Sequence, residues 1–332
     1  MISIVVPLYN EEENVSKLYG ELTAVANGSE LDCEFVFVDD GSQDATVQNL
    51  IRAADGDARV KIVTFRRNFG QTAAMAAGID YAQGDVIVTL DGDLQNDPAE
   101  IPRMVAKLDE GYDLVAGWRK NRKDAAISRK LPSMIANRII SRTTKVQLHD
   151  YGCTLKAIRA DVAKNLHLYG EMHRFIPALA AEQGVRIAEI PVNHRPRTAG
   201  KSKYGISRTF RVLLDLLTVK FFLGFSTRPL HMFGALGFFT GGVGSALMTW
   251  LVFDRVVFEV PLGTRPLLPI ATMLVLIGLQ FFCFGLLAEI LVRTYHESQD
   301  KKTYAVREVI TLGADRGDEG EFAKRRYVRR AV

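Results

Sequence analysis

The stretch GDVIVTLDGDLQNDP, residues 84–98, decides the fold. Its apolar part, 86–90, is rich in β-branched residues and is typical of a buried strand. Asp91 and Asp93 follow directly. A carboxylate pair at the end of a buried strand is costly unless a cation or hydrogen-bond donors compensate it. Spaced at i and i+2, these carboxylates can present oxygens to one divalent ion that also binds a diphosphate, with Gln95 adding a neutral oxygen.

Similar apolar runs recur along the chain, with helical patterns between them. The expected strands are 2–6, 34–38, 60–65, 86–90 and 113–116, and the expected helices are 12–26, 46–54, 72–81 and 99–110. This alternation predicts an α/β fold with a mostly parallel central sheet covered on both faces. In such sheets ligands bind beyond the carboxyl ends of the strands, so site residues should follow the strands directly.

Polar side chains do follow these strands. Asp39 and Asp40 come after the second one and can accept hydrogen bonds from a nucleobase or ribose. The sequence has no glycine-rich phosphate loop of the dinucleotide or P-loop type, so we expect metal and basic side chains to hold a diphosphate. Taken alone, Asp91 and Asp93 fit a helix-capping turn better than a metal site. The polar residues at neighbouring strand ends reverse that preference.

A resemblance to a known family rests on VVPLYNEEENV (5–15), VDDGSQDAT (38–46), RNFGQTAA (67–74), residues 84–98 and DYGCTLKAIR (150–159). Together they resemble a family 2 glycosyltransferase with the nucleotide-sugar-binding fold called GT-A. The most similar branch transfers one sugar to a polyisoprenyl phosphate, and includes dolichyl-phosphate mannose synthases, bactoprenol glucosyltransferases and undecaprenyl-phosphate aminoarabinose transferases. The resemblance implies a Rossmann-like catalytic domain, a nucleotide sugar and a polyisoprenyl phosphate as substrates, and Mg2+ or Mn2+ as cofactor.

The resemblance also implies site residues. The nucleotide-sugar contacts would be Pro7, Tyr9, Asn10, Glu11, Asp39, Asp40, Asn68, Gln71, Asp91 and Gly92. The metal ligands would be Asp91, Asp93 and Gln95. The catalytic residues would be Asp93, Asp150 and Arg119, with Arg119 near the phosphates. Gln71 departs from the Lys common at this place in mannose synthases, which leaves the sugar and one phosphate contact open.

Asp150 has two interpretations. It occupies a place where family members often carry an acid, so it would position groups or act as an auxiliary base. The alternative is a turn residue before Gly152. A phosphate monoester has a second pKa of about 6, so a lipid phosphate is largely ionised at neutral pH and needs little help from a base.

Basic residues predict where the acceptor phosphate binds. Arg129 and Ser133, four apart on an expected helix, match the acceptor-phosphate pair of mannose synthases. Arg197, Lys201 and Lys203 lie in a second basic run, which suits a lipid phosphate and anionic headgroups, although a solvated basic face is the usual alternative. We expect no nucleic-acid partner, because no binding module is recognised and the net charge is only +4.

Two long segments without Asp, Glu, Lys or Arg follow this body, at 230–253 and 267–288. A membrane-spanning helix needs about 20 apolar residues. We expect transmembrane helices at about 230–253 and 267–291, preceded by interfacial amphipathic helices at 206–227. Basic residues flank the pair and the 254–266 connector has no net charge, which predicts that both chain ends and the catalytic domain are cytoplasmic. Buried helices of a soluble domain are the weaker alternative.

The expected domains are a cytoplasmic GT-A domain at 1–205, amphipathic helices at 206–227, two transmembrane helices within 228–294, and a cytoplasmic tail at 295–332. Met1 leads directly into a strand-like run, so we expect no signal peptide. The tail contains a strand-like run at 304–312, which would pair with another subunit as an added strand or fray. A second copy of the chain, in a homo-oligomer, is therefore a candidate partner beside the lipid bilayer.

Composition limits the remaining classes. With 332 residues, 48% of them hydrophobic and 24% charged, the chain is not disordered overall. Its 3 cysteines are too few and too scattered for a disulfide framework or a four-ligand zinc site.

The predicted function is inverting transfer of one sugar, from a UDP-sugar by preference, to an undecaprenyl-type phosphate on the cytoplasmic face of the inner membrane, for cell-envelope glycans or glycolipids. The alternatives are a GDP-mannose-dependent mannose synthase and an inactive membrane adaptor that keeps the fold. A processive polysaccharide synthase is disfavoured, because it would require a Gln-x-x-Arg-Trp motif and a larger spanning region.

Overall fold

The computed structural model describes residues 1–120, 146–166, 168, 172–196, 229–259, 261–263, 265–298, 303–313 and 327–330. They belong to two units, one of Met1–Val219 with Lys302–Val332 and the other of Lys220–Lys301. The amphipathic helices expected at 206–227 lie outside the described residues. So do the predicted acceptor-phosphate residues Arg129, Ser133, Arg197, Lys201 and Lys203.

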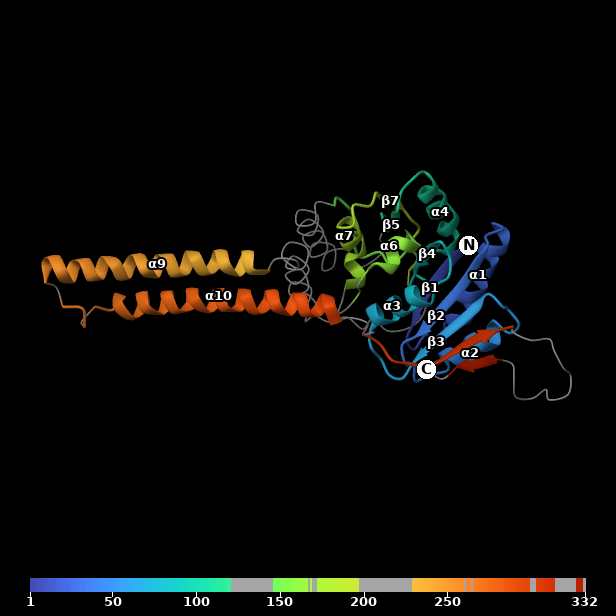
Figure 1. Cartoon of the computed structure of the whole chain (residues 1–332). Helices are drawn as coiled ribbons and strands as arrows, with labels where there is room; N and C mark the ends of the chain where they lie inside the picture. The colour runs from blue at the N-terminus through green and yellow to red at the C-terminus, as the bar shows by residue number, and fades with distance from the viewer. Residues whose placement is uncertain are drawn as a thin grey trace. The chain divides into compact units, whose positions relative to one another are not determined.

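The first unit is built on a nine-stranded sheet in the order β7-β5-β6-β4-β1-β2-β3-β8-β9 (Figure 1). The strands are β1 Ile2–Leu8, β2 Cys33–Asp39, β3 Val60–Phe65, β4 Val86–Thr89, β5 Leu114–Trp118, β6 Lys156–Arg159, β7 Ile187–Pro191, β8 Val306–Leu312 and β9 Tyr327–Arg330. β1 to β4 are parallel, whereas β6 is antiparallel to β4 and β5, and β8 is antiparallel to β3. The predicted α/β fold is confirmed, with a mixed sheet.

Helices cover both faces of this sheet. They are α1 Val15–Gly28, α2 Thr46–Ala53, α3 Gln71–Tyr81, α4 Ile101–Asp109, α6 Ala160–Lys164 and α7 Ile176–Ala181, with single 3-10 turns at η1 Pro98–Glu100 and η2 Met172–Phe175. Ile4 of β1 shares a core cluster with α1, α2 and α4. Val5 faces the other way, toward α3, where a Cβ on Gly78 would lie 2.1 Å from Val5 Cγ1. Burial on both faces explains why β1 is apolar at every residue but Ser3, whose hydroxyl donates to Glu34.

The strand directions gather the site at one edge. The parallel strands β1 to β4 all end there, and so does β5. Because β6 runs the opposite way, its first residue Lys156 pairs with Thr89, the last residue of β4. Residues that precede β6, at 150–155, therefore lie beside those that follow β4 and β5.

The carboxy-terminal segment belongs to the same sheet. The strand expected at 304–312 is present as β8, but it pairs with β3 of the same chain rather than with another subunit, and it is not frayed. Ile310 and Leu312 are buried in the core cluster. β8 covers an edge of β3 whose backbone groups would otherwise lack partners. Part of the segment expected as a tail at 295–332 thus completes the sheet.

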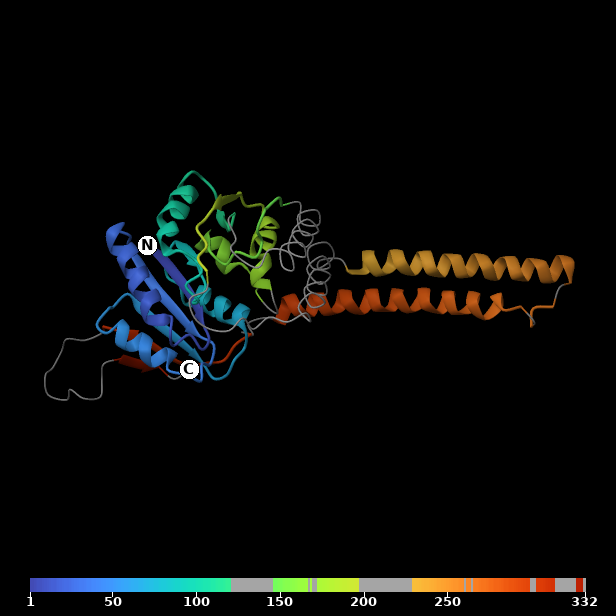
Figure 2. The ribbon, with the colours of Figure 1, turned by 180° about the vertical axis from the view of Figure 1, so that it is seen from behind.

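The second unit contains two long helices, α9 Pro229–Phe258 and α10 Leu267–Ser298, which lie side by side (Figures 1 and 2). Met232–Phe258 and Leu267–Ala288 are long and apolar enough to cross a membrane. Large apolar side chains are exposed on both helices, among them Phe238, Phe239, Val256, Met273 and Leu279. An apolar outer surface of this extent suits lipid and not water.

Small residues allow α9 and α10 to approach closely. A Cβ on Gly278 of α10 would lie 2.6 Å from the Cα of Gly241 on α9. A Cβ on Gly244 would lie 2.7 Å from the backbone nitrogen of Val275. These glycines therefore serve packing within the chain.

Candidate active site

Asp91 and Asp93 form an acidic pair directly after β4. Asp91 accepts hydrogen bonds on both carboxylate oxygens, from Gln71 Nε2 at 2.6 Å and from Thr154 Oγ1 at 2.6 Å. Asp93 is buried, and its Oδ1 accepts from the backbone N–H of Gln95 at 3.1 Å. Burial, and then the neighbouring charge of Asp93, raise the pKa of Asp91 to about 6. A bound cation would relieve the repulsion between the two carboxylates.

The donor set fits a metal ion that is shared with a substrate. Among the residues that the structure describes, no group of three or more His, Cys, Asp and Glu side chains is arranged to hold a metal. Mg2+ is commonly bound by one or two carboxylates, with substrate phosphates and water completing the octahedron. Asp91 and Asp93 suit that arrangement, because a hydrogen-bonded carboxylate oxygen keeps a second lone pair for a cation. The backbone N–H of Gln95 donates a hydrogen bond to Asp93.

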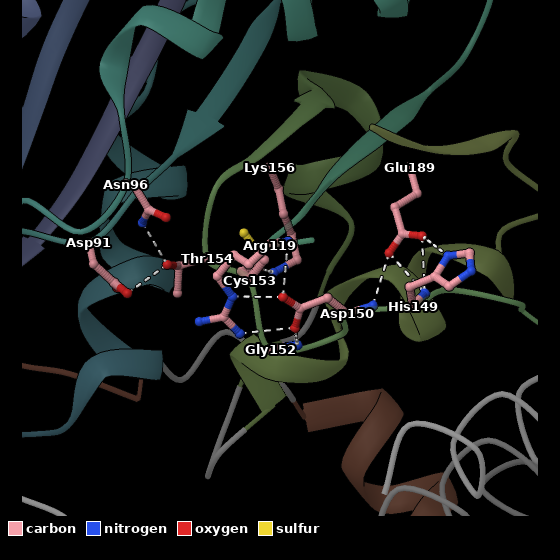
Figure 3. A network of polar contacts seen from close by, with 10 residues as sticks. All are labelled: Asp91, Asn96, Arg119, His149, Asp150, Gly152, Cys153, Thr154, Lys156 and Glu189. Carbon is pink, nitrogen blue, oxygen red and sulfur yellow. Dashed lines mark hydrogen bonds and ion pairs between the residues drawn. The ribbon is translucent and has the colours of Figure 1, made fainter. Parts of the chain in front are cut away.

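The segment before β6 supplies polar partners that the sequence did not single out. Thr154 donates its hydroxyl to Asp91 and accepts from Asn96 Nδ2 at 3.0 Å (Figure 3). The Thr154 carbonyl accepts from Thr89 Oγ1 at 2.7 Å. Thr154 therefore links β4, the loop that follows it and β6, which fixes the direction of the Asp91 carboxylate.

Arg119 and Asp150 form a buried bidentate ion pair. Arg119 Nε donates to Asp150 Oδ2 at 2.6 Å and Nη2 donates to Oδ1 at 2.9 Å (Figure 3). Burial lowers the pKa of Arg119, but the hydrogen bonds and charge of Asp150 outweigh burial and raise it. Asp150 also accepts from the backbone N–H of Gly152 at 3.1 Å. The Asp150 carboxylate thus holds Arg119 and accepts a backbone N–H of the following turn, and its role as an auxiliary base stays a prediction.

A second carboxylate fixes the backbone before Asp150. Glu189 of β7 accepts from the backbone N–H groups of His149 and Asp150, each at 2.9 Å, and contacts His149 Nδ1 at 2.7 Å (Figure 3). The His149 ring stacks on Trp118, with ring centroids 4.3 Å apart. Glu189 thus fixes the backbone of Asp150, and the stacked His149 ring contacts Trp118, the residue before Arg119. Both partners of the Arg119–Asp150 ion pair are therefore held in place.

Lys156 is a further buried cation that the sequence reading missed. Its side chain is 1% exposed and donates to the carbonyl of Cys153. Burial lowers the pKa of Lys156, whereas the charges of Cys153, Asp150 and Asp91 act to raise it. The available signal was a lysine within an apolar run, between Leu155 and Ala157.

The loops after β1, β2 and β3 carry the residues predicted to contact the nucleoside. Asp40 accepts from the backbone N–H groups of Phe69 at 2.6 Å and Gly70 at 2.9 Å. Asp39 accepts from the backbone N–H of Ser42 at 3.2 Å. Burial raises the pKa of both aspartates. Gly41, between them and Ser42, has φ +71, and a Cβ there would lie 2.6 Å from the backbone of Arg67.

The loop after β1 is bonded to the loop after β2. Asn10 donates its N–H to Ser42 Oγ at 2.9 Å, and its side-chain oxygen accepts from the N–H of Gln43 at 2.9 Å. Glu11 donates its N–H to Thr46 Oγ1 at 2.8 Å. Pro7 is buried in β1, Tyr9 is partly exposed and Asn68 is exposed. A Cβ on Gly92 would lie 2.5 Å from Leu8 Cδ2, so Gly92 allows the Asp91 loop to approach β1.

The sequence matches known proteins over most of its length. Residues 3–166 match the family described as glycosyl transferase family 2. The chain is 48% identical over 314 residues to the dodecaprenyl-phosphate galacturonate synthase of Rhizobium johnstonii, covering 93% of this chain and 92% of that protein. This chain belongs to glycosyl transferase family 2. The transferase is also 37% identical to the undecaprenyl-phosphate 4-deoxy-4-formamido-L-arabinose transferase of Shewanella sediminis, covering 95% of this chain and 94% of that protein.

Solved structures agree with the fold. The transferase resembles glucosyl-3-phosphoglycerate synthase from Mycobacterium tuberculosis in complex with Mn2+, UDP and phosphoglyceric acid, with a TM-score of 0.53 and 19% identity, covering 68% of this chain and 78% of that one. The complex of the same protein with Mn2+ and UDP-glucose gives a TM-score of 0.51 at 17% identity, covering 66% of this chain and 78% of that one. The GT-A prediction is confirmed.

Proposed function

We propose that this transferase moves one sugar from a nucleotide sugar to a polyisoprenyl phosphate. The observation that carries the proposal is similarity, over more than nine-tenths of the chain, to enzymes named for lipid phosphate acceptors. The same chain has an acidic sheet edge with a nearby arginine, and two candidate membrane spans. The acceptor is lipid-soluble, so an enzyme that uses it benefits from membrane-embedded helices. An inactive adaptor would have no need to retain Asp91, Asp93 and the Arg119–Asp150 pair together.

For the donor we propose a UDP-sugar, with galacturonate as the first sugar to test. The relative at 48% identity is named for galacturonate, whereas those at 37% are named for formamidoarabinose. Structural neighbours bind UDP-glucose with Mn2+. A GDP-mannose donor remains an outcome of the test.

In the proposed reaction, Asp91 and Asp93 would hold Mg2+ or Mn2+, whose charge would stabilise the departing diphosphate. Thr154 and Gln71 orient Asp91, and Asp150 fixes the Arg119 guanidinium toward the phosphates. The acceptor phosphate attacks the anomeric carbon from the opposite side, which inverts its configuration. Asp150 acts as a positioning residue, because an acceptor that is already ionised at neutral pH leaves no proton to remove.

Two further proposals concern the membrane topology and the residues that bind the acceptor phosphate. Both chain ends and the catalytic unit lie in the cytoplasm, as the charges flanking α9 and α10 indicate. The acceptor phosphate binds Arg129, Ser133, Arg197, Lys201 and Lys203. A cysteine introduced at Gly263 should then react only with an impermeant reagent applied from the non-cytoplasmic side.

The test is a transfer assay with the full-length protein in detergent or nanodiscs. Undecaprenyl phosphate is supplied with UDP-galacturonate, UDP-glucose, UDP-linked formamidoarabinose or GDP-mannose, each with Mn2+, and lipid products are separated. We expect one UDP-sugar to give a lipid-linked product that mild acid releases. A product from GDP-mannose alone would overturn the donor proposal, and no lipid product from any donor would overturn the function.

A further inference from the structure

The C-terminal segment, residues 303–313, follows closely after α10, which ends at Ser298. It joins the catalytic sheet on the strand that leads into the nucleotide-sugar site. β8 pairs with β3 from Lys61↔Thr311 to Phe65↔Val306, and the carbonyl of Ala305 accepts from the N–H of Arg66 at 3.1 Å. The contact therefore continues past the end of β3 into the loop that follows.

That loop, residues 66–70, is here called the donor loop because its last residues bond to one site residue and lead directly into another. The N–H groups of Phe69 and Gly70 bind Asp40, which follows β2. Gln71, the next residue and the first of α3, donates to Asp91. A shift of the donor loop would therefore move groups on both the nucleoside side and the diphosphate side.

Tyr304 contacts both elements that flank the donor loop. Its ring stacks on Phe65, the last residue of β3, with ring centroids 5.2 Å apart and an interplanar angle of 15°. Its hydroxyl donates to Asp80 Oδ2 of α3 at 2.6 Å. Tyr304 is 8% exposed, and burial together with Asp80 raises its pKa, so the phenol keeps the proton that it donates.

The stack continues into the loop itself. Phe65 packs edge-to-face against Phe69, with ring centroids 5.6 Å apart. The three contacting rings of Tyr304, Phe65 and Phe69 thus connect the C-terminal segment to Phe69, whose N–H binds Asp40. Aromatic contacts of this kind contribute beyond the area that they bury, and they fix ring orientation.

We infer that Tyr304 is a positioning residue for the nucleotide-sugar site, acting through Phe65, Phe69 and α3 on the donor loop. The inference rests on the proposed function, since it names a determinant of donor binding in that same site. It gives the segment after the second candidate span a role in the catalytic unit beyond edge protection. Donor binding, and not acceptor binding, is the step that should depend on it.

The experiment measures KM for the nucleotide sugar and for polyprenyl phosphate separately, and UDP affinity with Mn2+ by calorimetry, in the full-length protein. Tyr304→Leu keeps apolar volume but removes both the stack and the hydrogen bond. We expect it to raise donor KM and the UDP dissociation constant about five- to tenfold, with acceptor KM unchanged. Tyr304→Phe keeps the stack and should recover most of the donor affinity.

Ile310→Ala is the matched control. Ile310 lies in β8, six residues after Tyr304 in the same segment, and is 1% exposed, but it pairs with Ile62, away from the donor loop. It should lower the thermal unfolding midpoint while leaving donor KM at the wild-type value. Donor KM unchanged in Tyr304→Leu, or raised equally by Ile310→Ala, would reduce Tyr304 to a stability role. A wild-type protein that transfers no sugar would instead contradict the proposed function.

Discussion

Two acidic pairs follow β2 and β4, which lie on either side of β1 in the same sheet, and the structure uses the two pairs differently. Asp40, after β2, binds two backbone N–H groups of the donor loop, so its charge is compensated by the chain itself. After β4, burial and then the neighbouring charge of Asp93 raise the pKa of Asp91 to about 6. Similar sequence signals thus produce one pair that bonds to the backbone of the site and one for which we propose a bound cation.

The largest effect should come from the pair after β4. Asp93→Asn keeps the shape of the side chain but removes a charge from the proposed metal site, so we expect transfer to fall by about a thousandfold. The thermal unfolding midpoint should stay at or above the wild-type value, because removing one of two repelling carboxylates costs no stability. Full activity of this variant, or of the wild type in excess chelator, would remove the metal from the account.

The next effect concerns Asp150, whose charge is neutralised by Arg119. Asp150→Asn leaves the buried Arg119 without its counter-charge, which should cost the catalytic unit about 3–5 kcal/mol. A double-mutant cycle with Arg119→Gln, followed by thermal unfolding, measures the coupling. If the double variant loses as much stability as the two single variants added together, the ion pair is not what holds the site.

A smaller effect is expected at Asp40. In Asp40→Asn one of the two N–H groups loses a charge-assisted acceptor, which should lower the free energy of unfolding by about 1–3 kcal/mol and loosen the donor loop. Donor KM should rise several-fold while kcat falls less. Unchanged stability with a large loss of metal-dependent binding would instead place Asp40 in the metal site.

The smallest effect is expected at Asp39. Its bonds to the Ser42 N–H are long, at 3.2 and 3.3 Å, and an asparagine oxygen can accept the same bond. Asp39→Asn should therefore keep wild-type stability and weaken UDP binding about three- to tenfold, by loss of one charged acceptor for the nucleoside. Equal losses of stability in the Asp39 and Asp40 variants would erase the distinction drawn within that pair.

The sequence reading succeeded where the site depends on strand ends. The rule that ligands bind after parallel strands placed Asp39, Asp91 and Gln71 at one edge, and the structure joins Gln71 to Asp91 directly. It missed Thr154, which precedes β6, and Lys156, which begins it, because they reach this edge only since β6 runs antiparallel to β4.

The C-terminal segment shows a second limit. Its strand was predictable from its apolar alternation, but its partner was not, because Lys61 and Thr311 are far apart in sequence and local propensity carries no register. The same holds for Glu189, whose role is to fix the backbone of His149 and Asp150. Contacts of this kind follow from strand order and not from a motif.

One calorimetric titration tests the central claim that the pair after β4 holds a metal ion together with the diphosphate. UDP is titrated into the full-length protein with Mn2+ and with excess chelator, for the wild type, Asp93→Asn and Asp40→Asn. We predict that Mn2+ strengthens UDP binding at least about tenfold in the wild type and in Asp40→Asn, but not in Asp93→Asn. Equal UDP affinity with Mn2+ and with chelator in the wild type, or an undiminished Mn2+ effect in Asp93→Asn, would contradict the account.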